Sequence, residues 1–77
     1  MMYAVNEADN DFGHCYGVHL RDYTEQNVIE FKSWCDSVID GVYTFEPIHQ
    51  HRPRFHYDWN FWFGDEKDRI MFILRWS

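Results

Sequence analysis

Alternating apolar and polar positions occupy the first part of the chain and predict two half-buried strands. In the first strand Tyr3 and Val5 alternate with other residues, and in the second strand the apolar positions are Tyr16, Val18 and Leu20. A period of two is typical of strands with one buried face. The polar stretch 7–13 lies between them, so we expect an N-terminal hairpin with an acidic tip.

A helical period follows over residues 23–40. Its apolar residues recur at spacings of three and four, which places them on one stripe of a helix: Val28, Phe31, Cys35, Val38 and Ile39. Asp22 is followed three residues later by Glu25, which predicts the start of the helix, and Gly41 predicts its end. We expect the stripe to face a sheet.

The second half of the chain has the strongest alternation. A short strand is expected over residues 42–46, ending at Pro47. Aromatic residues then occupy five consecutive odd positions, which predicts a long strand with an aromatic face: Phe55, Tyr57, Trp59, Phe61 and Phe63. Residues 64–68 read as a turn, and residues 69–76 alternate again. We therefore expect a C-terminal β-hairpin.

The register of this hairpin follows from keeping all its apolar side chains on one face. A four-residue loop sets Phe61 opposite Phe72 and also places Asp58 opposite Arg75, an opposite-charge pair. The assembled prediction is a single α+β domain over residues 1–77. It has a four- to five-stranded antiparallel sheet, one amphipathic helix packed on one face, and the C-terminal β-hairpin.

Length and composition narrow the class of protein. A chain of 77 residues, 21% of them aromatic, has room for one modest core and not for a deep cleft between lobes. The apolar run 70–74 is far shorter than the roughly 20 residues of a membrane-spanning helix, and residues 1–7 lack the pattern of a secretory signal. We expect a cytoplasmic protein with no membrane partner, in which Cys15 and Cys35 stay reduced.

Negative charge is concentrated in the first part of the chain. Residues 1–46 carry nine acidic and two basic side chains, a net charge of −7, whereas residues 47–77 carry four acidic and five basic side chains, a net charge of +1. Such a field repels nucleic acid and attracts basic protein surfaces. Solubility alone is the alternative explanation for the charge.

The first candidate binding surface is acidic. We expect the outer face of the helix and the tip of the N-terminal hairpin to present six carboxylates: Asp9, Asp11, Glu25, Glu30, Asp36 and Asp40. Regularly placed carboxylates can imitate the phosphates of a duplex and occupy a nucleic-acid-binding groove. The alternative is a solvated helix face with no partner.

The second candidate surface lies on the outer face of the predicted sheet. There the expected register brings together three apolar side chains with an arginine-bearing rim: Trp62, Met71 and Ile73, with Arg54 and Arg75. A protein interface has this composition. Either a partner or a second copy docks there, or a loop of the same chain covers the patch.

Metal binding and catalysis have weaker support. His49, His51 and His56 could contribute imidazole ligands, but the chain has no closed set of four ligands at the spacing of a structural metal site. It also has no Gly-rich phosphate loop and no nucleophile elbow. We expect no cofactor and no enzymatic activity.

Three features of the chain bear on its class of protein. They are its short length, the aromatic segment 55–76 and the acidic helix residues Glu25, Glu30, Asp36 and Asp40. In these features the chain resembles the small acidic inhibitors that bacteriophages encode against host defence, such as anti-CRISPR proteins. The resemblance implies steric blocking of a nucleic-acid-binding or effector site, without turnover or cofactor. A homo-oligomerising or scaffolding domain that buries the Trp62 patch is the alternative.

Overall fold

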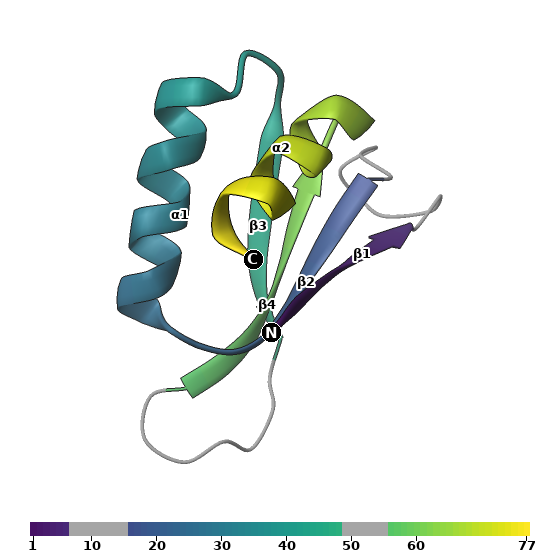
Figure 1. Ribbon diagram of the computed structural model, residues 1–77. Helices are drawn as coiled ribbons and strands as arrows, with labels where there is room; N and C mark the ends of the chain where they lie inside the picture. The colour runs from purple at the N-terminus through teal and green to yellow at the C-terminus, as the bar shows by residue number, and fades with distance from the viewer. Residues whose placement is uncertain (7–15, 49–55) are drawn as a thin grey trace.

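The computed structural model describes residues 1–6, 16–48 and 56–77 (Figure 1). In chain order the elements are β1 (Met2–Asn6), β2 (Tyr16–Thr24), α1 (Glu25–Val38), β3 (Tyr43–Ile48), β4 (His56–Phe63) and α2 (Glu66–Trp76). The predicted α+β class is therefore confirmed. The tip of the N-terminal hairpin and the loop between β3 and β4 lie outside the described residues.

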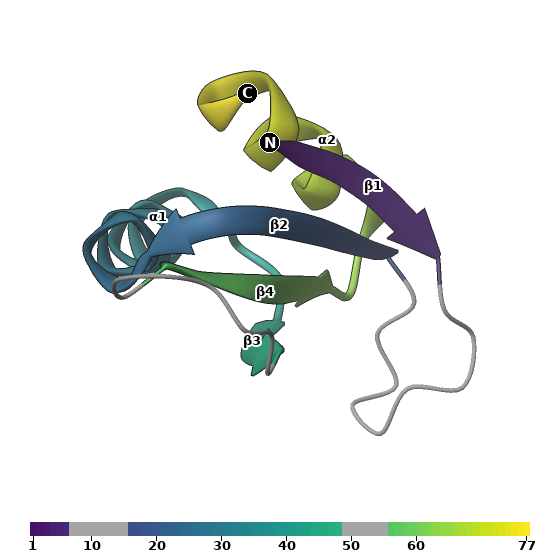
Figure 2. The ribbon, with the colours of Figure 1, turned by 90° about the horizontal axis from the view of Figure 1, so that it is seen from below.

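The strands form one antiparallel sheet in the order β1-β2-β4-β3. Because β2 and β3 are both antiparallel to β4, they run parallel to each other, and α1 connects them. Both helices lie on the same side of the sheet (Figure 2). Among the described residues, no helix lies on the other sheet face.

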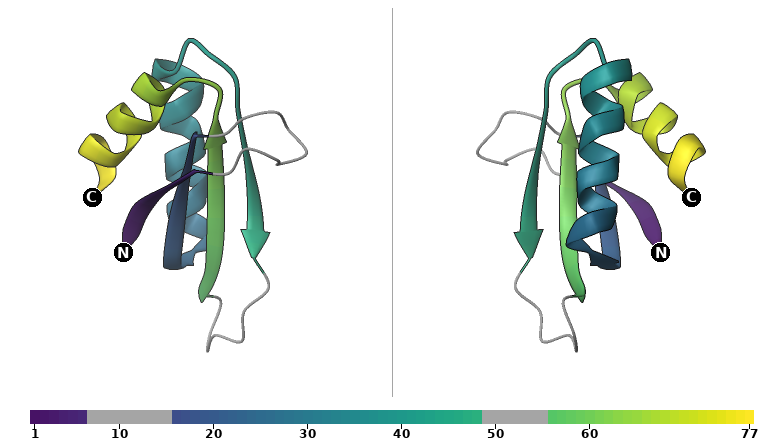
Figure 3. Two further views of the ribbon diagram at one scale, coloured as in Figure 1. Left: turned by 90° about the vertical axis from the view of Figure 1, so that its right-hand side faces the viewer. Right: turned by 90° about the vertical axis from the view of Figure 1, so that its left-hand side faces the viewer.

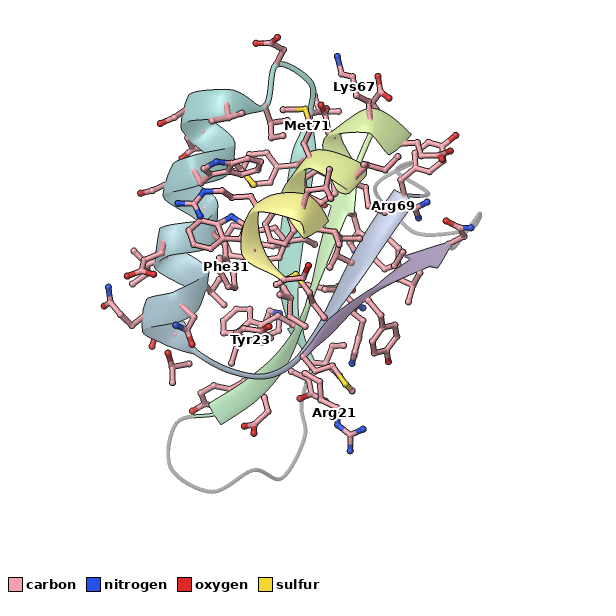
Figure 4. All side chains as sticks on the ribbon, viewed as in Figure 1. Arg21, Tyr23, Phe31, Lys67, Arg69 and Met71 are labelled. Carbon is pink, nitrogen blue, oxygen red and sulfur yellow. The ribbon has the colours of Figure 1, made fainter. Side chains whose placement is uncertain are left out.

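The core lies between the helices and the sheet. It is built from side chains that alternate along β2 and β4 and recur at helical spacing on α1, together with one residue of α2: Val18, Leu20, Phe61, Phe63, Val28, Phe31, Cys35 and Phe72. Phe72 stacks on Phe61 at a centroid distance of 5.1 Å and meets Phe31 edge to face at 5.6 Å. Figure 4 shows Phe31 pointing from α1 into this interior. One aromatic side chain thus joins α2, α1 and the sheet.

The start of α1 differs from the prediction. Thr24, not Asp22, is the N-cap, and its hydroxyl accepts a hydrogen bond from the Asn27 amide at 3.2 Å. The Asn27 side chain accepts the Thr24 amide in return, which completes a capping box. Asp22 instead lies at an irregularity between Leu20 and Tyr23, with φ of 67°. The helix starts later because β2 resumes pairing with β4 at Tyr23 after this irregularity.

The predicted C-terminal hairpin is wrong, because residues 66–76 form α2. Asp65 caps this helix by accepting the Lys67 amide at 2.9 Å. The alternation that suggested a strand also satisfies a helical spacing, since Phe72 and Trp76 are four residues apart and lie on the inner side. Phe61 and Phe72 still meet, but across the layer between helix and sheet.

With the hairpin absent, its register is also absent. The strand β4 pairs with β2 and β3 instead. Arg75, on α2, lies over the ring of Trp76, 4.4 Å from the centroid. Asp58 is buried on β4 and accepts a hydrogen bond from the Asp22 amide at 3.0 Å. The predicted pair of Asp58 and Arg75 therefore does not form, because each residue contacts a different part of the chain.

Arg69 fixes α2 to the edge of the sheet (Figure 4). Its guanidinium donates to the Val5 carbonyl at 3.0 Å and to the Asn6 side chain, and it lies 5.4 Å from the centroid of the Tyr16 ring. Only 9% of the residue is exposed. The predicted one-helix domain is thus a two-helix domain in which a buried arginine joins the last element to the first strand.

Gly17 carries a testable constraint of the fold. A Cβ at this position would lie 2.5 Å from Trp62 Cζ3 and 2.9 Å from Val5 Cγ2, and Trp62 is only 2% exposed. The indole has no room to move away, so Gly17→Ala should destabilise the protein by about 1–3 kcal/mol through overpacking. Urea denaturation followed by tryptophan fluorescence measures the difference. Ser33→Ala, at an exposed position of α1, is the control and should change stability by less than about 0.5 kcal/mol. Equal stability of both variants would contradict this packing.

Candidate docking groove

Two shallow hollows are lined by residues of α1 and β3, and we call the two together the α1–β3 groove. One end is a hollow of about 490 Å³ lined by Lys32, Asp36, Tyr43, Thr44 and Phe45. The other end is a hollow of about 220 Å³ lined by Glu25, Pro47, Ile48, Tyr57 and Trp59. The right-hand view of Figure 3 shows α1 toward the viewer, with β4 and then β3 beside it. The groove combines aromatic side chains of the sheet with charged side chains of the helix.

Stacked rings form the floor of the groove. Phe45 of β3 stacks on Phe61 of β4 with a centroid distance of 5.2 Å, and Tyr43 lies parallel to Phe61 at 6.4 Å. The register explains the stacking, because Phe45 lies directly opposite Phe61. Phe45 nevertheless keeps 36% of its surface exposed. The floor is therefore built from stacked rings and is partly accessible.

A hydrogen-bonded cluster closes one end of the groove. The Lys32 ammonium donates to Asp36 Oδ2 at 2.8 Å, and the Tyr43 hydroxyl donates to the other oxygen of the same carboxylate. Hydrogen bonds from Lys32 and from Tyr43 lower the pKa of Asp36. Burial and the adjacent Asp36 carboxylate raise the pKa of Tyr43. Asp36 is thus an anion whose charge is already paired within the chain.

The other end of the groove has the composition of a site for a cation. Tyr57 and Trp59 meet edge to face, with centroids 6.3 Å apart and planes at 85°. The exposed Glu25 lies at the first turn of α1 beside them. Aromatic faces beside a carboxylate attract an ammonium or guanidinium group. The buried indole N–H of Trp59 has no acceptor within the described ranges.

The acidic residues predicted from the sequence do not form one face. Glu25, Glu30, Asp36 and Asp40 are all exposed. Glu25 and Asp36 border the groove. At about 100° per residue, Glu30 lies roughly 120° around α1 from Asp36, and Asp40 lies in the connection after the helix. Asp9 and Asp11 fall outside the described residues.

The predicted outer-sheet patch does not exist as a surface. Trp62 is buried on the sheet face opposite the helices and donates from its indole nitrogen to Glu46 at 3.2 Å. Met71 and Ile73 belong to α2 and are half-buried on the helix side; Figure 4 shows Met71 there. Arg75 is on α2 as well, and Arg54 lies outside the described residues. The patch failed because it assumed that residues 69–76 form a strand.

A polar network on the open sheet face was missed. His19 Nδ1 lies 2.9 Å from Asn60 Oδ1, and His19 Nε2 lies 3.9 Å from Asp58 Oδ2. The Tyr3 ring lies 5.0 Å from the His19 ring. The network was visible in principle, because His19, Asp58 and Asn60 all occupy the polar phase of their strands. Pairing β2 with β4 instead of a C-terminal strand brings them together.

The predicted metal ligands give no site in the described part of the chain. No group of three or more His, Cys, Asp or Glu residues is placed there to hold a metal ion. His49 and His51, like Cys15, lie outside the described residues, and the backbone of His56 begins β4. Burial raises the pKa of the Cys35 thiol to about 12, so this cysteine stays a protonated core residue at neutral pH.

Comparison with sequence families, with curated proteins and with solved structures finds no match for this chain. Among the residues that the structure describes, neither helix has the length and apolarity that crossing a bilayer requires. Arguments about function therefore depend on the geometry and charge of this molecule.

Tyr43→Phe tests the cluster at the end of the groove. Loss of the hydroxyl removes one of the two hydrogen bonds that lower the pKa of Asp36, so this pKa should rise toward its ordinary value of about 3.9. A lowered carboxyl pKa contributes stability above the unfolded value and loses it as the pH falls through the folded value. The variant should therefore lose less stability than wild type on acidification. An NMR titration of the Asp36 carboxyl carbon measures the shift, with Lys32→Gln as a second variant expected to act in the same direction. An unchanged Asp36 titration in both variants would contradict the cluster.

Proposed function

We propose that this chain is a small, non-catalytic protein-binding inhibitor that docks on a basic surface of its partner through the α1–β3 groove and the carboxylates of α1. The observation that carries the proposal is the charge of α1. Three carboxylates, Glu25, Glu30 and Asp36, are exposed on the helix, and its one basic side chain, Lys32, is paired with Asp36. A partner would therefore meet uncompensated negative charge.

Charge alone does not separate a binding face from a solvated face. The aromatic end of the groove makes the difference, because Tyr57 keeps 39% of its surface exposed next to Trp59 and Glu25. Stable interfaces combine an aromatic centre with a polar rim, and arginine is enriched in them. An arginine or lysine of the partner would place its cation against Tyr57 and Trp59 and its charge near Glu25.

The sign of the charge supports a partner with a basic surface. A site on a protein that binds nucleic acid is basic, and the inhibitor carries a net charge of −6. Its carboxylates would displace counterions from such a site as phosphates do. Together with the resemblance to phage-encoded inhibitors, this favours a host defence complex such as a CRISPR effector as the target. Binding would take place in the cytoplasm of the host cell, without cofactor and without direct contact to nucleic acid.

The alternative is a scaffolding domain that buries Trp62, Met71 and Ile73, but these three side chains do not share one surface. Trp62 is separated from the other two side chains by the sheet itself, since it faces away from the helices. A self-associating form of this protein would need a different face.

The charge of α1 is tested with the double variant Glu25→Gln and Glu30→Gln. The measurement is inhibition of target-DNA binding by purified CRISPR effector complexes, followed by gel mobility shift at two salt concentrations. Wild type should inhibit at stoichiometric ratio. The double variant should be weaker by about tenfold, or about 1.4 kcal/mol, and less sensitive to salt. Gln26→Ser, also on the exposed side of α1, is the control without change of charge. Wild-type potency in the double variant would rule out this face.

The aromatic hollow is tested separately with Tyr57→Ala. Because this residue is more than a third exposed, its loss should leave the fold intact and remove one wall of the cation site. Inhibition should weaken by about tenfold, within the range of cation–π and interface-centre contributions. Val42→Ala, which truncates an exposed apolar side chain that lines neither the hollow nor β1, is the control. Equal loss in the two variants would contradict a specific role for the hollow.

A further inference from the structure

The outer edge of β1 presents backbone groups that have no use within the described fold. Arg21 donates its amide to the Met1 carbonyl at 2.8 Å, and the Met1 amino group donates to the Arg21 carbonyl at 3.3 Å. In an antiparallel pair, residues that exchange both bonds alternate with residues that exchange none. The amides and carbonyls of Met2, Ala4 and Asn6 therefore point away from β2, toward the rim of the sheet.

Within the described residues, this edge lacks the usual protection of edge strands. Proteins commonly place a charged side chain or a proline there to prevent pairing with other chains. The strand β1 has neither, since its sequence is Met-Tyr-Ala-Val-Asn. Figure 2 shows β1 at the rim of the sheet with α2 above it.

The opposite edge of the sheet differs. The strand β3 contains Glu46 and Pro47. The bond from the Gly64 amide to the Val42 carbonyl, at 3.0 Å, fixes the alternation there, so that Pro47 falls at an outward-facing position. A proline offers no amide donor, which blunts this edge. One edge of the same sheet is thus protected and the other is open.

We infer that β1 pairs with β1 of a second copy of the chain, antiparallel about a two-fold axis at Ala4. In this register Ala4 lies opposite its own counterpart and Met2 lies opposite Asn6 of the second copy. All three outward-facing residues then find partners, with up to about six new backbone hydrogen bonds. The two four-stranded sheets become one continuous sheet of the dimer.

The side chains suit this self-pairing. On the open sheet face, Tyr3 meets Val5 of the second copy, an aromatic and β-branched pair of the kind that stabilises sheets. On the helix face, the small Ala4 lies at the axis. Although the chain carries a net charge of −6, no charged side chain of β1 faces its counterpart. Pairing through Met2–Asn6 therefore places no like-charged side chains opposite each other.

Two apolar residues of α2 are exposed and could enlarge the interface. Ile70 is 47% exposed and Leu74 is 77% exposed, four residues apart on the outer side of a helix whose Arg69 contacts the end of β1. The chain ends, which follow α2 and precede β1, lie side by side in Figures 1 to 3. A specific interface buries about 600 Å² or more per copy, roughly an eighth of the 5137 Å² surface of the chain. The strand edge alone is small for this area, so the dimer should also include Ile70 and Leu74.

The test is sedimentation equilibrium of wild type, Ala4→Pro and Ala4→Val up to about 1 mM, the weak limit of measurable association. Ala4→Pro removes an outward amide that the described fold does not use, and an edge strand tolerates proline. We expect wild type and Ala4→Val to dimerise, and Ala4→Pro to have a dissociation constant at least about tenfold higher. Circular dichroism establishes that the variants are folded.

A second measurement does not depend on any variant. Hydrogen exchange of wild type at low and high concentration should show protection of the Ala4 and Asn6 amides that increases with concentration. The Glu25→Gln and Glu30→Gln variant should dimerise normally, because those residues are remote from β1. A monomeric wild type at the highest concentration would overturn the inference, as would a dimer whose protection rises at β3 instead of β1.

Discussion

Phe72 of α2 packs against Phe61 of β4, and the arrangement of the whole molecule depends on this contact. The ring is fully buried and also meets Phe31 and Phe63, so one side chain joins both helices to the sheet. A domain of 77 residues buries a limited area, and large aromatic side chains offset the small number of core residues. Moving residues 69–76 into the sheet would leave the aromatic face of β4 with one helix to cover it. The second helix therefore completes the core that the aromatic strand requires.

The predictions from the sequence were correct where local periodicity distinguishes a helix from a strand. The class of fold, the existence of β1 to β4 and most of α1 follow from local periodicity. The predicted ends were wrong in two places: β3 continues through Pro47 to Ile48 because Pro47 lies at an outward-facing position of this edge strand, and α1 ends at Val38, before Gly41. Residues 70, 72, 74 and 76 are apolar and fit both periods, because positions four apart are neighbours on a helix as well as on a strand face. Asp65 favours the helix over the strand, because its side chain caps a helix by accepting a hydrogen bond from the Lys67 amide. Asp65 lies in the segment 64–68, whose polar composition also fits a turn, so the cap is ambiguous in the sequence alone.

The candidate site was only partly predictable for a related reason. Exposure of Glu25, Glu30, Asp36 and Asp40 follows from helical spacing alone. Their partners do not, since Tyr43 reaches Asp36 only because β3 runs beside α1. The aromatic hollow joins residues from α1, β3 and β4, and no local pattern relates them. Trp62 does lie on the sheet face that its position in β4 predicts. The predicted neighbours Met71 and Ile73 are absent from that face because they belong to α2.

The α1–β3 groove and the open edge of β1 lie at opposite rims of the sheet. The α1–β3 groove borders β3, the last strand in the order β1-β2-β4-β3, and the open edge belongs to β1, the first. Pairing through β1 would leave both grooves of the dimer unobstructed and place them far apart on one rigid sheet. A dimer of this form would offer two acidic docking sites with fixed separation, and a target with two basic sites at that separation would bind it far more tightly than it binds one copy. Because a rigid connection loses this gain when the spacing is wrong, self-pairing would also add selectivity that charge alone does not provide.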